Sequence, residues 1–355
     1  MSNNKKKTTT ALILSAVLLA AAVLSGCGGS SNADTAAASA GSAAAESTAA
    51  AAAENAQVRI AIQPSAAFVP LFVAKENGWI EEALAEKGVE VVWNDFESGP
   101  PMNESLAAGS SDIGVIGDVP TVSAIAAGQD NLVAATTAKA ADSYAILVPA
   151  DSEVSSAADL SGKKIATVIG STGHNLVRKF LEKEGLSLAD VELVNISAGD
   201  AAAVLTSGEV DAVAIWEPNV TRITGSGAAK IIAEGSDVGL AGTNTMVVRK
   251  EYAEANGEVL QVILEQYARG AKELENIDEE TLAGVAEYLS LETEQLKQVI
   301  AKFQYTVIPD QEDIDSLNDT IEFLGNIDAI SETYDITDRV VSDYADTDAV
   351  KAYLQ

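Results

Sequence analysis

The feature that most constrains the fold is an alternation of strand-like and helix-like patterns that begins at Gln57. Short runs rich in β-branched residues, such as 58–62 and 89–96, precede stretches whose apolar residues recur about every three to four positions, such as 101–108. The alternation continues to Ala233. This order is typical of α/β proteins in which mostly parallel sheets are covered by helices.

The other expected elements follow the same alternation, and the last hundred residues are expected to be helical. The further strands are expected at 113–116, 132–136, 165–169, 191–194, 212–215 and 231–233. The helices are expected at 70–84, 119–127, 174–184, 201–206, 258–274, 279–289, 292–303 and 311–324.

Two extended stretches, 144–149 and 244–248, join two successive α/β sets. They predict two lobes and two chain crossings that serve as hinges. One lobe is then discontinuous, and the lobe assignment is 57–145 with 240–355 for the first and 146–239 for the second. Ligands of open parallel sheets bind at the carboxyl ends of the strands, so the loops of two facing lobes are expected to line one cleft.

The first residues are typical of a secretory leader, assigned to 1–26. A positive patch, Lys5 to Lys7, precedes an apolar run at 11–23, which is shorter than the roughly 20 residues of a membrane-spanning helix. The run ends in Leu24-Ser25-Gly26-Cys27, which resembles a bacterial lipobox. That resemblance implies cleavage before Cys27 and lipidation of its thiol. The alternative is an ordinary leader with an incidental cysteine.

Residues 27–56 are almost entirely Ala, Ser, Gly and Thr with scattered acids. Such a stretch offers too little apolar surface to offset the entropy of ordering it. We therefore expect a flexible tether between a lipid anchor and the folded part.

Composition excludes several classes of function. The chain has 53 acidic and 22 basic residues, a formal net charge of −31, which disfavours nucleic acid as a partner. It has one cysteine and one histidine, so neither an intrachain disulfide nor a site with two imidazoles can form. Most histidine- or cysteine-dependent catalysis is thereby excluded, and we expect no enzyme activity and no metal or other cofactor.

Four loops lie at equivalent positions, each at the end of an expected strand. They are Ser98-Gly99-Pro100-Pro101-Met102, Gly117-Asp118-Val119-Pro120, Gly170-Ser171-Thr172-Gly173-His174 and Ile215-Trp216-Glu217-Pro218. Three of them open a helix with glycine or serine and contain no lysine or arginine. Helix N-termini offer unpaired N–H groups and a positive dipole end, so these loops can hold an anion without a cationic side chain. For any one loop, a simple helix cap is the alternative.

These loops, together with Ala145-Ile146-Leu147-Val148-Pro149 and the run from Asp159 to Ala166, resemble binding proteins for aliphatic sulfonates. Those proteins lie within a wider family that serves nitrate, taurine and thiamine-precursor uptake. The resemblance, from about Val58 to Tyr305, implies a two-lobed periplasmic-binding-protein fold of type II. It also implies an extracytoplasmic monomer that delivers a small organic anion to an ABC permease.

The resemblance also implies which residues meet the ligand. The sulfonate would contact amides and hydroxyls of Ser98, Gly99, Gly117, Asp118, Ser171 and Thr172, with Gln63 as a polar group and Phe68 as an apolar wall. The other candidate residues are Pro100, Ser143, Gly173, His174, Trp216 and Glu217. Sulfonate binders often carry serine and alanine before the histidine, where this chain has Thr172 and Gly173.

Several of these side chains have an alternative role. Trp216 either packs in the core or forms a wall against an alkyl chain. Asp118 is expected to cap its own helix, and His174 either caps a helix or contacts the anion. Glu217 either forms a rim salt bridge with Arg222 or a lysine, or meets the ammonium group of a ligand such as taurine. Nitrate, taurine and thiamine precursors stay open as ligands, and a membrane-tethered sensor stays open as a function.

Overall fold

The computed structural model of the protein describes residues 56–355. The predicted leader, Cys27 and all but the last residue of the predicted tether lie outside the described residues. Within 56–355, every helix is too short or too polar to cross a bilayer.

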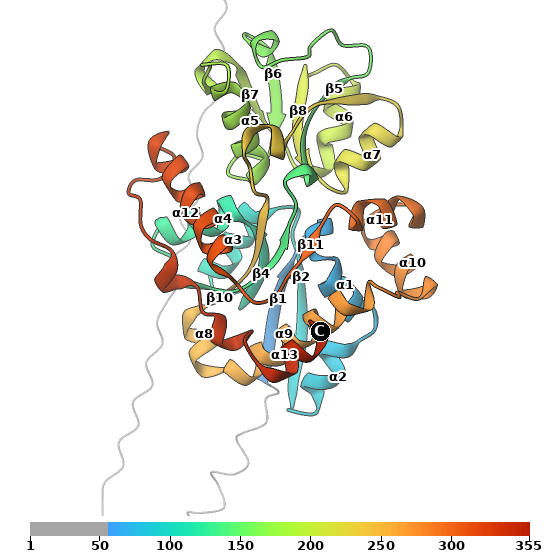
Figure 1. Ribbon diagram of the computed structural model, residues 1–355, viewed down its shortest axis with the longest axis vertical. Coiled ribbons are helices and arrows are strands. Elements are labelled where there is room, and N and C mark those ends of the chain that lie inside the picture. The colour runs from blue at the N-terminus through green and yellow to red at the C-terminus, as the bar shows by residue number, and fades with distance from the viewer. Residues whose placement is uncertain (1–55) are drawn as a thin grey trace, which may run out of the picture. The chain divides into compact units, whose positions relative to one another are not determined.

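The described residues form two β-sheets (Figure 1). The six-stranded sheet has the order β11-β4-β10-β3-β1-β2, and we call the half of the molecule built on it the large lobe. Its strands are β1 (Ala56–Ile62), β2 (Val89–Asp95), β3 (Ile113–Gly117), β4 (Asn131–Lys139), β10 (Thr243–Arg249) and β11 (Gln304–Tyr305).

The five-stranded sheet has the order β7-β6-β8-β5-β9, and we call the half built on it the small lobe. Its strands are β5 (Tyr144–Pro149), β6 (Lys164–Thr167), β7 (Glu192–Asn195), β8 (Ala212–Trp216) and β9 (Ala229–Glu234). The expected α/β class with two sheets is therefore present, while the exact lobe boundaries stay a prediction.

Each sheet is mixed: most of its strands share one direction, as expected, and a minority run against them. β1 is parallel to β2 and β3, and β6 is parallel to β7 and β8. In contrast, β10 is antiparallel to β3 and β4, and β5 is antiparallel to β8 and β9. The connections explain the antiparallel strands. A parallel neighbour needs a crossover helix, whereas the chain enters β5 and β10 directly from the opposite lobe.

The predicted hinges at 144–149 and 244–248 are wrong, because both stretches are buried strands in the interior of their sheets. The chain instead crosses between the lobes at 140–143 and at 239–242. These two crossing segments lie side by side, with the Ala140 amide donating to the Gly242 carbonyl at 3.2 Å. A Cβ on Gly242 would lie 2.4 Å from the Ala140 carbonyl oxygen, so this close approach requires glycine.

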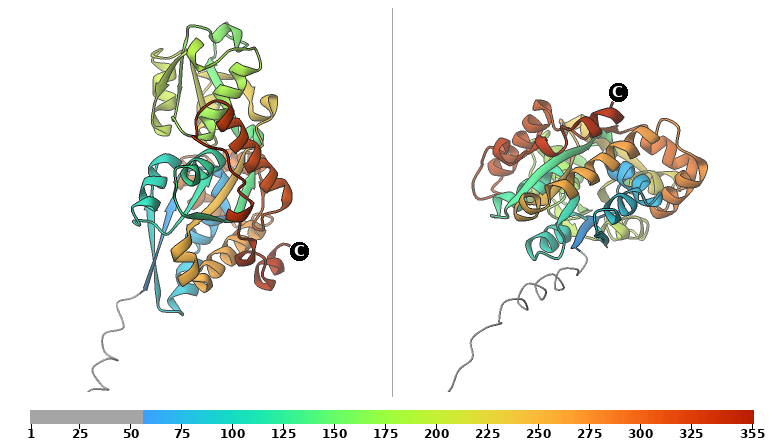
Figure 2. Two further views of the ribbon diagram at one scale, coloured as in Figure 1. Left: turned by 90° about the vertical axis from the view of Figure 1, so that its left-hand side faces the viewer. Right: turned by 90° about the horizontal axis from the view of Figure 1, so that it is seen from below.

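Helices cover both faces of the six-stranded sheet (Figure 2). Strand β1 shows why, since Val58, Ile60 and Ile62 belong to the core on one face and Ala61 to the core on the other. One face is covered by α1 (Val69–Glu76), α2 (Trp79–Ala85), α8 (Lys250–Ala255), α9 (Gly257–Glu273), α10 (Glu279–Tyr288), α11 (Thr293–Ile300) and α13 (Asp348–Tyr353). The other face is covered by α3 (Gly99–Ala107), α4 (Asp118–Ala126) and α12 (Gln311–Asn326).

The helix expected at 70–84 is two helices, α1 and α2. Gly78, between them, has a φ of 66°, a left-handed conformation that ends one helix and redirects the chain into the next. The apolar periodicity on both sides of the break is similar, which is why the pattern suggested a single helix.

The small lobe packs around one apolar core. Its helices are α5 (Thr172–Glu182), α6 (Ala201–Thr206) and α7 (Asn219–Gly225). Leu176, Val177 and Leu181 of α5 are buried in this core, and the start of α5 lies beside the large lobe, at Asp118. Packing within this lobe therefore positions the start of α5 for a role at the cleft.

Candidate ligand-binding site

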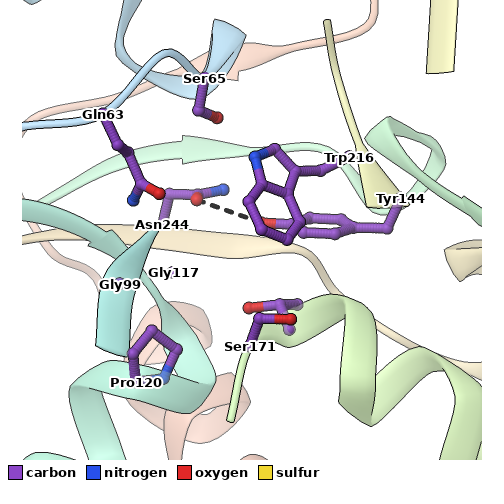
Figure 3. Close-up of a pocket in the computed structure, with 10 residues that line it drawn as sticks. Gln63, Ser65, Gly99, Gly117, Pro120, Tyr144, Ser171, Trp216 and Asn244 are labelled. Atoms are coloured by element: carbon purple, nitrogen blue, oxygen red, sulfur yellow. Dashed lines mark hydrogen bonds between the residues drawn. The ribbon is translucent and has the colours of Figure 1, made fainter. Parts of the chain in front are cut away.

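A small cavity lies where the two lobes meet (Figure 3). Ten residues line it: Gln63, Ser65, Gly99, Gly117, Pro120, Tyr144, Ser171, Thr172, Trp216 and Asn244. Six of the predicted site residues are among them, namely Gln63, Gly99, Gly117, Ser171, Thr172 and Trp216. Both lobes contribute, as expected for a cleft formed by strand-end loops.

The loop after β1 supplies Gln63 and Ser65 from the large lobe. Gln63 is held by its side-chain amide, which donates to the Val115 carbonyl at 3.2 Å, so its side-chain oxygen is left available. The Ser65 side chain accepts from the Ala67 amide at 3.4 Å and caps the short helix η1 (Ala66–Phe68). Its hydroxyl hydrogen is left to donate elsewhere.

Two helix N-termini of the large lobe reach the cavity together. Gly99 is the first residue of α3, and Gly117 is the N-cap of α4. A Cβ on Gly99 would lie 2.6 Å from Pro120 Cγ, so only glycine allows the starts of α3 and α4 to approach so closely. The dipoles of both helices therefore act on one small volume, although Pro100, Pro101 and Pro120 have no N–H and the Val119 amide is bound to Asp118.

The small lobe brings a third helix N-terminus. Ser171 is the N-cap of α5, and its hydroxyl oxygen accepts from the His174 amide at 3.2 Å. The hydroxyl hydrogen remains to donate into the cavity. Thr172 is the first residue of α5 and also lines the cavity. The predicted convergence of helix starts is thus present in the geometry.

Two aromatic residues of the small lobe form a further wall. Tyr144 begins β5, Trp216 ends β8, and the two are direct partners in the antiparallel pair. Figure 3 shows both rings facing the cavity, with the indole nitrogen of Trp216 on the side of Gln63 and Ser65. An aromatic wall beside polar donors suits a ligand with an anionic head and an apolar tail.

Sequence reasoning missed four lining residues: Ser65, Pro120, Tyr144 and Asn244. Asn244 accepts from the Tyr144 hydroxyl at 3.2 Å and donates to the Gly242 carbonyl at 2.9 Å. Tyr144 and Asn244 begin the stretches whose sequence predicts hinges, and a hinge gives no reason to expect a ligand contact. Pro120 belongs to one of the four loops named from the sequence, and for Ser65 the available signal is a serine directly after a strand.

Asp118 lies beside the cavity and is fully buried rather than exposed to a ligand. Its carboxylate accepts from the Val119 amide at 2.7 Å, from the Thr172 hydroxyl at 2.6 Å and from the Thr320 hydroxyl at 3.0 Å. Burial raises the pKa of this carboxyl, and these hydrogen bonds oppose the rise. Asp118 is the first residue of α4 and Gly117 is its N-cap, so the expected cap is replaced by a bond to the next amide, that of Val119.

Glu217 is also fully buried, and its carboxylate pairs with Lys302 at 2.6 Å. It accepts as well from the Thr221 amide and hydroxyl, both at 3.0 Å. This geometry corresponds to the salt-bridge alternative with a lysine.

The remaining candidates lie around the cavity and are not among its lining residues. Phe68 is fully buried in the core of the large lobe. Ser98 is the N-cap of α3, Pro100 lies near Gly170 of the opposite lobe, and the Ser143 hydroxyl donates to the Ala140 carbonyl at 2.7 Å. Gly173 packs against the Ala214 carbonyl, where a Cβ would lie at 3.2 Å.

His174 follows the α5 N-cap, and its Nδ1 accepts from the Gly170 amide at 3.3 Å. Burial, with a further contribution from the charge of Arg178, lowers the pKa of His174 to about 4. The imidazole is therefore neutral at ordinary pH, and it adds no charge to the start of α5.

The lining of the cavity is uncharged within the part of the chain that the structure describes. It combines N–H groups at helix starts with hydroxyl, amide and indole side chains. Residues 56–355 also contain no cluster of three or more His, Cys, Asp or Glu side chains placed to hold a metal ion. Such a lining can desolvate and hydrogen-bond an oxyanion.

Two α/β lobes around one polar cavity define the class of two-lobed binding-protein folds. The alkanesulfonate-binding protein of Xanthomonas axonopodis pv. citri, solved with bound MOPS, matches this chain with a TM-score of 0.74 at 30% identity. The match covers 82% of this chain and 99% of that protein. The chain belongs to the NMT1/THI5-like family, which matches residues 65–280.

Two curated relatives agree with this assignment. A putative aliphatic sulfonates-binding protein of Escherichia coli K12 is 31% identical over 67% of this chain and 74% of its own length. The taurine-binding periplasmic protein of the same strain is 31% identical over 59% of this chain and 63% of its own length. The resemblance and the two-lobed fold class stated from the sequence are confirmed, and these relatives are binding proteins by name.

Proposed function

We propose that the protein is the extracytoplasmic solute-binding component of an ABC importer and that it binds an aliphatic sulfonate between its lobes. One observation carries the proposal: three helix N-termini from two lobes converge on a cavity whose described lining is uncharged and polar. The sulfonate-binding relatives support it.

The energetics suit a scavenging receptor. A dissociation constant of about 1 μM corresponds to roughly −8 kcal/mol. Hydrogen bonds to a charged group each contribute about 1.5–3 kcal/mol net. Five or six donors reach that range after the entropic costs of binding and lobe closure. The available donors include the helix-start amides and the hydroxyls of Ser65 and Ser171.

A sulfonate without an ammonium group fits better than taurine. An ammonium needs a carboxylate or several acceptors, and both acids beside the cavity are engaged elsewhere. Asp118 accepts from three donors, and Glu217 pairs with Lys302. The apolar end of an alkanesulfonate can instead lie against Trp216 and Tyr144.

Calorimetric titration with ethanesulfonate, taurine, nitrate and a neutral aminopyrimidine tests the assignment. We expect micromolar binding of ethanesulfonate and at least about tenfold weaker binding of taurine, since an ammonium left without a partner is costly to desolvate. Tight binding of the pyrimidine with no response to any anion would overturn the oxyanion assignment. Tighter binding of taurine would overturn the preference between sulfonates.

We also propose a lipid anchor on Cys27, with residues 1–26 as its leader, 27–56 as a tether and the protein acting as a monomer. The support is the lipobox-like sequence, because no described residue bears on it. Incorporation of labelled palmitate in a bacterial host, with Cys27→Ser as the control, tests the anchor. Equal labelling of both forms would refute it. Analytical ultracentrifugation of the purified protein tests the monomer, and no turnover of sulfonates is expected.

A further inference from the structure

Two buried carboxylates lie beside the cavity, one on each lobe, and each accepts a hydrogen bond from the opposite lobe. Asp118 begins α4 of the large lobe, and Glu217 follows β8 of the small lobe. Neither lines the cavity. The two carboxylates therefore join one lobe to the other and are not placed to contact a ligand.

The first contact joins Asp118 to Thr172 of α5. The Thr172 hydroxyl donates to Asp118 Oδ1 at 2.6 Å. The other bonds of this carboxylate come from its own lobe, from the Val119 amide and the Thr320 hydroxyl. The large lobe therefore holds Asp118 in place, and Thr172 is the partner that the small lobe adds.

The second contact joins Glu217 to Lys302, which follows α11 in the large lobe. The Lys302 ammonium lies 2.6 Å from Glu217 Oε1, and the lysine side chain is 32% exposed while the glutamate is fully buried. Thr221 of the small lobe holds the same carboxylate from its own side. Close by, the Ala66 amide of the large lobe donates to the Glu217 carbonyl at 3.3 Å.

Separation of the lobes would remove Thr172 and Lys302 from these carboxylates and replace them with water. While the lobes are joined, Lys302 and Thr172 offset part of the cost of burying the two carboxylates, so loss of either partner disfavours the joined arrangement. Because both donors act with no ligand present, the contacts stabilise the empty closed form as well as the liganded one.

We propose that Asp118–Thr172 and Glu217–Lys302 are a pair of closure latches. They set the fraction of ligand-free receptor whose lobes are together, and Lys302 and Thr172 act as positioning residues. Apparent affinity depends on that fraction, so the latches set affinity and ligand residence time. The inference uses the proposed function only in assuming that the ligand binds in this cavity.

The test measures the distance between the lobes in the full-length protein without ligand. Spin labels are placed by Glu104→Cys and Glu184→Cys, at exposed positions of the large and small lobes, in a Cys27→Ser background. Pulsed electron resonance then gives the interlobe distance distribution. We expect Lys302→Met to shift this distribution toward longer distances than in the parent.

The matched control is Lys297→Met on α11. Lys297 pairs with Glu294 of the same helix at 2.7 Å, with both side chains largely exposed, so its loss removes an ion pair within one lobe. This control is expected to leave the distance unchanged. If Lys302→Met and Lys297→Met give the same distribution as the parent, the latch proposal is wrong.

A steric variant gives an independent reading. A Cβ on Gly117 would lie 2.6 Å from Thr172 Oγ1 and 3.7 Å from Thr172 Cβ, across the lobe contact. Gly117 has φ −74° and ψ 171°, which alanine also adopts, so Gly117→Ala is expected to fold. We expect Gly117→Ala to open the ligand-free protein at least as far as Lys302→Met does. An unchanged interlobe distance would contradict the close contact between Gly117 and Thr172.

Ligand kinetics complete the test, with ethanesulfonate as the probe. Lys302→Met is expected to weaken binding about tenfold, mainly through faster dissociation, since truncating one partner of a buried charge pair acts on the off-rate. If Lys302→Met does not fold, Glu217→Gln with Lys302→Met removes the unpaired charge and is read in the same way. If opening occurs but no sulfonate binds, the latch stands and the proposed function fails. If sulfonate binds but no variant opens, the proposed function stands and the latch proposal is wrong.

Discussion

The two lobes contribute different chemistry to one cavity. The large lobe supplies backbone, through the starts of α3 and α4, together with the polar side chains of the β1 loop. The small lobe supplies two aromatic rings and the hydroxyls at the start of α5. Under the proposed function, the large lobe would supply two of the three helix starts that meet the anionic head, and the small lobe would supply the third together with the rings that cover the attached chain.

The largest loss of affinity is expected for Gly99→Ala, which changes the backbone approach of α3 and α4 in the large lobe. The new Cβ would lie 2.6 Å and 2.8 Å from two atoms of Pro120 and would push the starts of α3 and α4 apart. We expect about a hundredfold loss of ethanesulfonate affinity by calorimetry, together with a loss of about 1–3 kcal/mol in unfolding free energy from overpacking.

Gly199→Ala is the matched control, because its Cβ would meet nothing closer than 3.8 Å on an exposed turn of the small lobe. It should bind as the parent does. Unchanged affinity in Gly99→Ala would break the assignment of the anionic head to the large lobe.

The aromatic side is probed by Trp216→Ala, with Trp216→Phe as the control that keeps a ring. Loss of a buried aromatic wall is expected to weaken butanesulfonate by about 10- to 30-fold and methanesulfonate by less, since only the longer chain reaches apolar surface. The comparison of the two ligands separates contacts with the sulfonate group from contacts with the alkyl chain. Equal losses for both would show that Trp216 acts through packing alone.

Acid stability tests the neutral histidine at the start of α5. The unfolded chain takes up a proton near pH 6.5, whereas the folded His174 does so only near pH 4. Because the pKa of folded His174 is lowered, the unfolded chain binds a proton more readily below pH 6.5. The free energy of unfolding is therefore highest above pH 6.5 and falls as the pH falls toward 4. Between pH 6.5 and 5 the loss is expected to be about 2 kcal/mol in unfolding free energy.

His174→Gln should remove that slope in urea unfolding followed between pH 6.5 and 5. The attribution is direct because the chain has one histidine. A slope that persists in the variant would show that other groups cause it and that the imidazole is not desolvated.

The smallest effect is expected from Tyr144→Phe. It removes one neutral hydrogen bond, from Tyr144 to Asn244, worth about 0.5–1.5 kcal/mol. Affinity for ethanesulfonate should fall no more than about threefold, and the unfolding free energy should fall by about 0.5–1.5 kcal/mol. A loss as large as that in Trp216→Ala would mean that the Tyr144 hydroxyl contacts the ligand directly, in addition to the start of α5.

The sequence predicted the α/β class because strand and helix periodicities are local properties. The starts of α3, α4 and α5 were accessible for the same reason, since glycine, serine and proline mark helix N-termini. Strand direction was not accessible, because the residues of β5 and β10 fit either direction and only the long-range connection decides it.

The partners of single side chains were also beyond the sequence. Lys302 lies 85 residues from Glu217, and Thr320 lies 202 residues from Asp118. Tyr144 and Asn244 contact each other over 100 residues, because the two crossings run together. Such pairs depend on the tertiary fold, so sequence could offer only a choice between a salt bridge and a ligand contact for Glu217.

The paired crossing segments, 140–143 and 239–242, restrict how the lobes can move apart. Two hydrogen-bonded chains side by side resist a twist of one lobe against the other more than they resist bending. Tyr144 and Asn244 follow directly after these segments, so their hydrogen bond lies near the axis of such a bend. A ligand would therefore leave through a gap that widens away from this axis.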